Sequence, residues 1–66
     1  MKVRLNGSNT DVPSGATVAD LIETLGLGAQ RVAVELNRDA IAREQWSRTV
    51  LSESDQIEVV RFVGGG

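Results

Sequence analysis

Only one segment of this chain has the apolar spacing of a helix, and this limits the folds open to it. Its apolar residues follow the i, i+3, i+4, i+7 spacing of one helical face: Val18, Leu21, Ile22 and Leu25. Thr17 is placed to cap the free N–H groups, and Asp20 completes a capping box in which Asp replaces Glu. Gly26 is a natural left-handed stop, so we expect a helix over residues 18–25.

The other apolar residues alternate with polar ones in short runs typical of β-strands. Four such runs cover residues 2–6, 9–12, 31–36 and 56–63. Asn6-Gly7 is a strong hairpin signal between the first two, and Pro13 ends the second or places it at a sheet edge. Between the last two runs, residues 40–42 are expected to pair briefly. Residues 43–46 are expected to form a short helical turn anchored by Trp46.

A single helix cannot cover both faces of a sheet this size, so we predict two layers: a mixed sheet of four to five strands curled around the helix, an α+β fold. The first and last strands are expected to lie side by side in its centre. We assign residues 1–63 to one domain and residues 64–66 to a flexible C-terminal glycine tail.

The amino-acid composition excludes several classes of catalytic and binding site. The 66 residues include no Cys and no His, which removes the usual nucleophilic triads, soft-metal sites and imidazole catalysis. Seven basic and nine acidic residues give a net charge of −2, with no footprint for nucleic acid or an anionic membrane. The alternating N-terminus lacks the apolar core of a signal peptide. We therefore expect a cytoplasmic protein that is not an enzyme and binds no metal or cofactor.

The glycine tail suits delivery of a reactive group into another protein. Gly64, Gly65 and Gly66 have no side chains, so the segment fits a passage too narrow for any Cβ, and extended it reaches about 10 Å. A carboxylate on Gly66 is an anion at neutral pH and a competent nucleophile toward the α-phosphate of ATP. From composition alone, a frayed, disordered end is the simpler explanation of the tail.

The last predicted strand is expected to have two different faces. Ile57 and Val59 point to the core, whereas Val60 and Phe62 point away from it and form either a docking surface or additional core. Glu58 is a candidate for an acidic part of such a surface. Arg61 is either a contact for acidic groups of a partner or a solvated charge.

Segments spread over the whole chain resemble the ThiS family, the sulfur carriers of thiamine biosynthesis. These segments are Met1–Gly7, Val18–Ile22, Val32–Asn37, Arg43–Trp46, Asp55–Ile57 and Phe62–Gly66. The resemblance implies a ubiquitin-like β-grasp fold. It also implies that a ThiF-type enzyme adenylates Gly66 with ATP and magnesium, that sulfur from cysteine arrives through a desulfurase, and that thiazole synthase (ThiG) uses the resulting thiocarboxylate. Gly64 and Gly65 then enter the partner active sites.

Three alternatives remain open at this point. The chain is a carrier of the same class for molybdopterin or cysteine synthesis, a ubiquitin-like modifier that forms isopeptide bonds, or a plain binding module with an irrelevant tail. The terminal glycines are common to ubiquitin-like carriers, so they indicate the mechanism and leave the pathway undecided.

Overall fold

The structure, a computed structural model, describes residues 1–28 and 31–62. The expected boundary between residues 63 and 64 and the expected tail, residues 64–66, lie outside this range. Along the chain the elements are β1 (Lys2–Leu5), β2 (Ser8–Asp11), α1 (Val18–Thr24), β3 (Val32–Leu36), β4 (Asp39–Ile41), the 3₁₀ helix η1 (Arg43–Arg48) and β5 (Gln56–Arg61).

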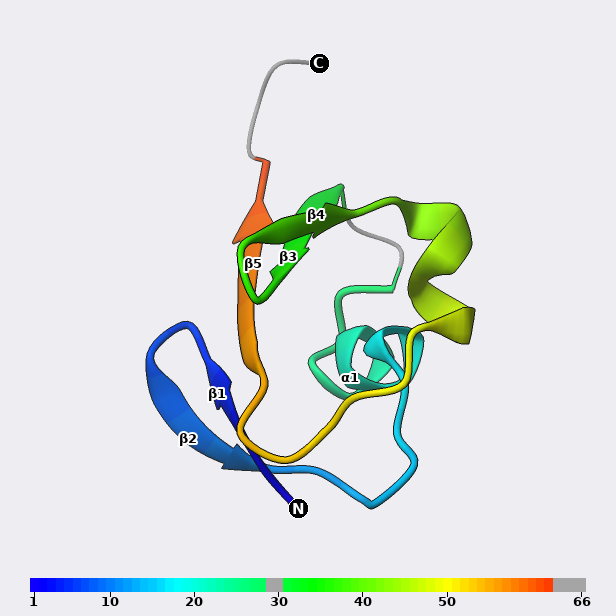
Figure 1. The fold of residues 1–66 in the computed structure, drawn as a ribbon. Helices are drawn as coiled ribbons and strands as arrows, with labels where there is room; N and C mark the ends of the chain where they lie inside the picture. Colours follow the sequence, from blue (N-terminus) through cyan, green and yellow to red (C-terminus); the bar gives the residue numbers. More distant parts are fainter. Residues whose placement is uncertain (29–30, 63–66) are drawn as a thin grey trace.

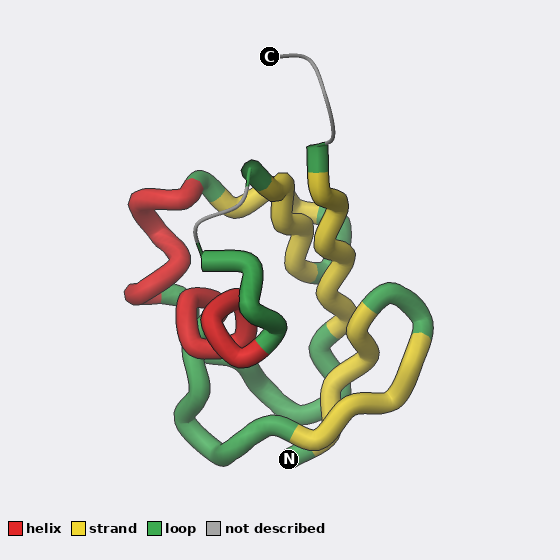
Figure 2. The backbone as a smooth tube through the Cα atoms, turned by 180° about the vertical axis from the view of Figure 1, so that it is seen from behind, coloured by secondary structure: helices red, strands yellow, loops and turns green. Residues whose placement is uncertain are grey.

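The strands form one mixed sheet in the order β2-β1-β5-β3-β4. β5 runs parallel to β1 and antiparallel to β3, and the two outer pairs, β1–β2 and β3–β4, are antiparallel. The predicted pairing of the first and last strands at the centre is therefore confirmed. Figure 1 shows the sheet curling past α1, and Figure 2 shows the helices together on one side of it. This is the predicted two-layer arrangement.

The helix begins where the sequence predicted. The Thr17 Oγ1 accepts a hydrogen bond from the Asp20 backbone N–H at 3.1 Å. The Asp20 carboxylate in turn accepts one from the Thr17 N–H at 2.9 Å. Both halves of the capping box are thus formed, and three residues of the predicted stripe are buried: Val18, Leu21 and Ile22.

The fourth residue of the stripe was predicted wrongly: Leu25 is 39% exposed. The helix ends at Thr24, and the next residues form a Schellman turn in which Gly26 has φ of 74°. The Gly26 N–H bonds to the Glu23 carbonyl at 2.9 Å, and the Leu27 N–H bonds to the Ile22 carbonyl at 3.1 Å. This turn packs Leu27 against the core in the place expected for Leu25.

Trp46 is the anchor of the second short helix, as predicted. Its side chain is buried, and its Nε1–H donates to the Ile41 carbonyl at 3.1 Å. The Arg43 guanidinium lies over the indole, 4.6 Å from the ring centroid. The helix runs two residues further than expected, to Arg48, so that η1 packs against α1 and closes the core.

The buried core joins both layers. Ten apolar residues make it up: Val3, Val12, Ala16, Val18, Leu21, Ile22, Val34, Trp46, Leu51 and Ile57. Among the described residues no buried side-chain polar atom lacks a hydrogen bond. A small core with every buried polar group satisfied lets a short chain fold without a crosslink.

The capping box gives a first prediction. Thr17→Ala removes the acceptor for the Asp20 N–H and should lower the free energy of unfolding by about 1 kcal/mol. Thr17→Ser keeps a hydroxyl at the same place and should lose much less. Urea unfolding followed by circular dichroism measures both variants. Equal losses in the two would show that packing of the Thr17 methyl group, and not the cap, stabilises the helix.

Candidate functional site

β5 leads directly to the glycines of the sequence, so the contacts that hold it position any group beyond it. On the β1 side, Asn6 follows the strand in a left-handed conformation, with φ of 50°. Its backbone N–H donates to the Ile57 carbonyl at 2.8 Å. Its side chain then bonds to Val59 twice: Oδ1 accepts from the Val59 N–H at 2.8 Å, and Nδ2 donates to the Val59 carbonyl at 3.2 Å.

Asn37 makes a similar set of contacts from the β3 side. It also has a positive φ, 51°, and its N–H donates to the Gln56 carbonyl at 2.7 Å. Its Oδ1 accepts from the Gln56 N–H at 3.0 Å, and its Nδ2 reaches the Asp55 carboxylate at 3.0 Å. Two asparagines therefore continue the hydrogen bonding along β5 where the backbones of its neighbours turn away. From the sequence, Asn6 was identified only as part of a hairpin turn.

The two faces of β5 differ as predicted. Ile57 is 1% exposed and Val59 is half-buried against the core, whereas Val60 and Phe62 are 56% and 59% exposed. Of the two interpretations left open for this pair, additional core is therefore wrong. Glu58 is also exposed and falls on the same side of the strand by its two-residue spacing from Val60.

Arg61 does not share that face. Its Cα partner is Val32, whose neighbours on the same side of β3 line the core, so Arg61 lies at the end of the inner face. The structure thus groups three of the four candidate docking residues and separates the fourth. Phe62 is still tied to the sheet, because its N–H donates to the Arg31 carbonyl at 2.9 Å. Figure 1 shows that this end of β5 lies opposite the N-terminus.

Gly64, Gly65 and Gly66 lie outside the described residues. The structure describes the chain up to Phe62, two residues before the first of these glycines. The last described residue, Phe62, is held at the end of a strand that has hydrogen-bonded neighbours on both sides.

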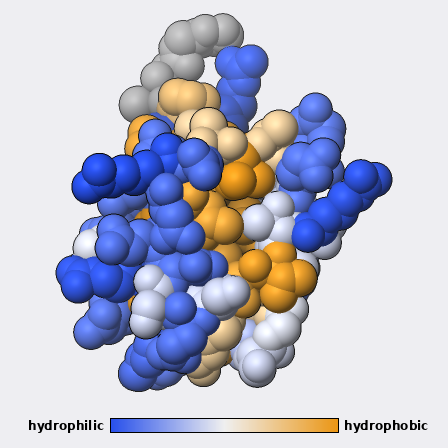
Figure 3. Space-filling view, in the orientation of Figure 1, coloured by the Kyte–Doolittle hydropathy of each residue, from blue (hydrophilic) through white to orange (hydrophobic). Residues whose placement is uncertain are grey.

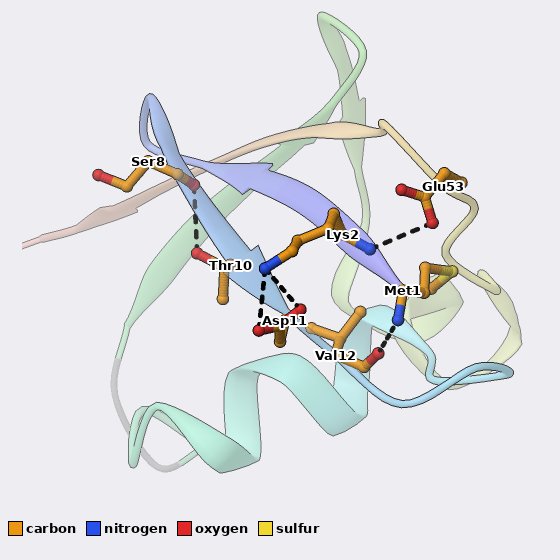
Figure 4. Close-up of polar contacts among 7 residues, drawn as sticks. All are labelled: Met1, Lys2, Ser8, Thr10, Asp11, Val12 and Glu53. Atoms are coloured by element: carbon orange, nitrogen blue, oxygen red, sulfur yellow. Dashed lines mark hydrogen bonds and ion pairs between the residues drawn. The ribbon is translucent and has the colours of Figure 1, made fainter.

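A hollow of about 280 Å³ lies elsewhere, between β2, the following loop and α1. Its ionisable side chains already have roles in the fold. The Asp11 carboxylate forms an ion pair with Lys2 Nζ at 3.0 Å, and Asp20 belongs to the capping box. Figure 4 shows Asp11 beside the N-terminal strand, where the Met1 amino group donates to the Val12 carbonyl and the Lys2 N–H donates to Glu53. These carboxylates therefore stabilise the fold.

Within the described residues, no helix is both long and apolar enough to cross a membrane. The elements instead define a class of protein. A mixed five-stranded sheet that curls around one main helix, with the first and last strands parallel at its centre, is the ubiquitin-like β-grasp fold.

Comparison with known proteins identifies the family. The model of the ThiS family matches residues 3–66, and the chain belongs to that family. It is 35% identical to the sulfur carrier protein ThiS of Bacillus subtilis, over 97% of this chain and 98% of that protein. A crystal structure of the thiamine biosynthesis protein ThiS from Geobacter metallireducens superposes with a TM-score of 0.84 at 32% identity, over the full length of both chains.

A second kind of relative is larger. The chain is 44% identical, over its whole length, to part of a thiazole synthase from Magnetococcus marinus, and it spans only 20% of that protein. The predicted resemblance to ThiS and the predicted β-grasp fold are confirmed by these comparisons. The Bacillus subtilis relative, which this chain matches almost from end to end, is named a sulfur carrier protein, in agreement with the prediction that the chain is a protein co-substrate.

The asparagine contacts give a second prediction. Asn6→Gly keeps a residue that tolerates positive φ but removes both side-chain bonds to Val59, and should lower the free energy of unfolding by about 1–2 kcal/mol. Gly7→Ala, which strains the same turn at φ of 84° without touching Val59, is the control for effects on the turn itself.

Amide hydrogen exchange distinguishes loss of the Asn6–Val59 hydrogen bonds from strain in the turn. The Val59 N–H should exchange much faster in Asn6→Gly and remain protected in Gly7→Ala. Unchanged protection of Val59 in Asn6→Gly would contradict the assigned role of Asn6.

Proposed function

We propose that this chain is a sulfur carrier for thiazole formation in thiamine biosynthesis and works in the cytoplasm. The observation that carries the proposal is the position of β5 in a chain of the ThiS family. This central strand holds Phe62 firmly at the edge of the domain, and the sequence continues into Gly64-Gly65-Gly66. The name of the Bacillus subtilis relative, a sulfur carrier protein, supports the same function.

The reactive group of the proposal is the carboxylate of Gly66. One of its oxygens attacks the α-phosphorus of ATP, pyrophosphate leaves, and a mixed anhydride with AMP results. A sulfur nucleophile at the oxidation level of sulfide then attacks the acyl carbon, and AMP leaves with the carboxyl oxygen. The product is a thiocarboxylate, and the exchange requires no oxidant or reductant. Gly64 and Gly65 enter the partner active sites because they have no side chains to exclude them.

The proposal requires enzymes to act on the chain. A ThiF-type adenylating enzyme uses ATP and magnesium, and thiazole synthase (ThiG) receives the sulfur. The sulfur comes from cysteine through a desulfurase as a persulfide, and a thiol reductant brings it to the level of sulfide before the exchange described above. The Magnetococcus marinus relative supports the last of these partners, because a segment similar to this chain is part of a protein named thiazole synthase.

We place docking of these partners on the face of β5 that points away from the core. Glu58, Val60 and Phe62 lie together there, beside the point from which the glycines continue. Arg61 borders this surface from the other side of the strand. A surface next to the reactive end aligns that end with an active site as it binds.

The chemistry gives a third prediction. Incubation with a ThiF-type enzyme, ATP, magnesium and a sulfide donor should raise the intact mass by one exchange of oxygen for sulfur. Omission of ATP should abolish the change. An unaltered mass under conditions that charge the Bacillus subtilis carrier would exclude the proposed function.

An added alanine after Gly66 is the matched control, because it moves the carboxylate to a different residue and leaves the fold untouched. This extended chain should not be charged. If it is charged at the normal rate, the carboxylate of Gly66 is not the acceptor.

The docking surface gives a fourth prediction. Val60→Ser should raise the KM of the adenylating enzyme for the chain about fivefold to tenfold with little change in kcat. The substitution removes an apolar contact that is made equally in the enzyme–substrate complex and in the transition state. Val50 is a matched control: it is 58% exposed, compared with 56% for Val60, and lies beside α1 instead of on β5. Val50→Ser should leave KM unchanged, and equal effects of the two substitutions would contradict the assigned surface.

A further inference from the structure

The register of β3 and β5 brings two carboxylates together. Glu35 and Glu58 are Cα partners, so their side chains stand directly opposite each other on one face of the sheet. The neighbouring pair, Val34 and Val59, points to the core, and both glutamates are exposed. Nothing in the spacing of either strand alone indicates that these two residues meet.

No cation of the described residues forms an ion pair with either glutamate. Neither carboxylate has a hydrogen bond or ion pair to any described residue. On β1, Lys2 bonds to Asp11, and the Arg4 guanidinium donates to the Gly7 carbonyl at 3.1 Å. Like charges directly opposite each other destabilise a sheet, so this arrangement does not serve the fold.

Apolar residues adjoin the acidic pair on the same face. We define the outer patch as Ala33, Ala40, Val60 and Phe62. Ala33 is the Cα partner of Val60, and Ala40 is the Cα partner of Glu35. All four residues of the patch are exposed. Figure 3 shows apolar surface at the end of the molecule where the chain leaves β5. The face therefore combines an apolar area with two adjacent carboxylates that form no ion pair with a described residue.

We propose that the outer patch docks on thiazole synthase at a protein surface that is apolar and carries one guanidinium or ammonium group, which lies between Glu35 and Glu58. This inference rests on the proposed function and adds the chemistry of the contact. A cation between the two carboxylates replaces their repulsion with two charge-assisted hydrogen bonds. Part of the driving force for docking is thus the relief of an unfavourable contact within the free chain.

Charge complementarity favours a protein surface with a cation over the other possible binding partners. The phosphates of nucleic acid and the headgroups of an anionic membrane would be repelled by the pair. A second copy of the chain, docked through the same face, would bring two acidic pairs into one interface. Thiazole synthase is the partner supported by comparison, since a segment similar to this chain makes up 20% of a thiazole synthase in Magnetococcus marinus.

The experiment measures binding of the uncharged chain to separately purified thiazole synthase from the same organism by calorimetry at several salt concentrations. Glu35→Gln and Glu58→Gln should each raise Kd about tenfold and flatten its dependence on salt. Glu23→Gln, an equal loss of charge on the exposed face of α1, is the matched control and should bind like the unaltered chain.

A second measurement distinguishes docking from a structural role. Glu35→Lys places opposite charges across the strands and should raise Tm by about 2–4 °C, while the same substitution should abolish the measured binding. A residue needed only for folding would change stability and binding in the same direction.

Three results would overturn the inference: no binding of the unaltered chain, binding by both Gln variants with the affinity and salt dependence of the unaltered chain, or sedimentation of the free chain as a dimer that dissociates in Glu35→Lys. The charging assay reports on the proposed function separately, because it does not involve thiazole synthase. A chain that is charged normally but fails these binding tests retains its function and loses only this docking contact.

Discussion

The placement of β5 between β1 and β3 is the constraint on which the rest of the molecule depends. The last strand of the chain closes the sheet, and its inner residue Ile57 is 1% exposed at the centre of the core. Without β5 the two hairpins, β1–β2 and β3–β4, have no contact through the sheet. The same strand therefore completes the fold and fixes the position of Phe62, the last described residue before the glycines of the sequence.

Local signals in the sequence were enough to predict the elements and their order. The stripe around Leu21 and the capping box of Thr17 depend on residues within a few positions of each other, and both are confirmed. The error at Leu25 has a physical cause. The Schellman turn at Gly26 ends the helix early and gives the core position to Leu27, so a period of 3.6 residues no longer applies there.

The contacts made between distant residues could not be predicted in this way. Asn6 bonds to Val59 across 53 positions of the sequence, and its role depends on which strand lies next to β1. Periodicity places Glu35 and Glu58 on the exposed faces of their strands, but only the register shows that they face each other. The placement of Val60 and Phe62 on the face opposite Ile57, in contrast, follows from simple alternation and was predicted. Alternation left open whether that face is exposed or covered, and the structure shows that it is exposed.

The two faces of β5 are under different structural constraints. Ile57 is 1% exposed in the core. Protein cores are close-packed, so few side chains are tolerated there. Substitutions at Glu58 or Val60 leave that core intact and change only what the sheet presents to a partner. Because alternate residues of the strand point to opposite faces, the docking surface can vary in sequence while the core-facing residues stay unchanged. The unfavourable pairing of Glu35 with Glu58 is consistent with this division, because stability lost on the outer face need not disturb the inner one.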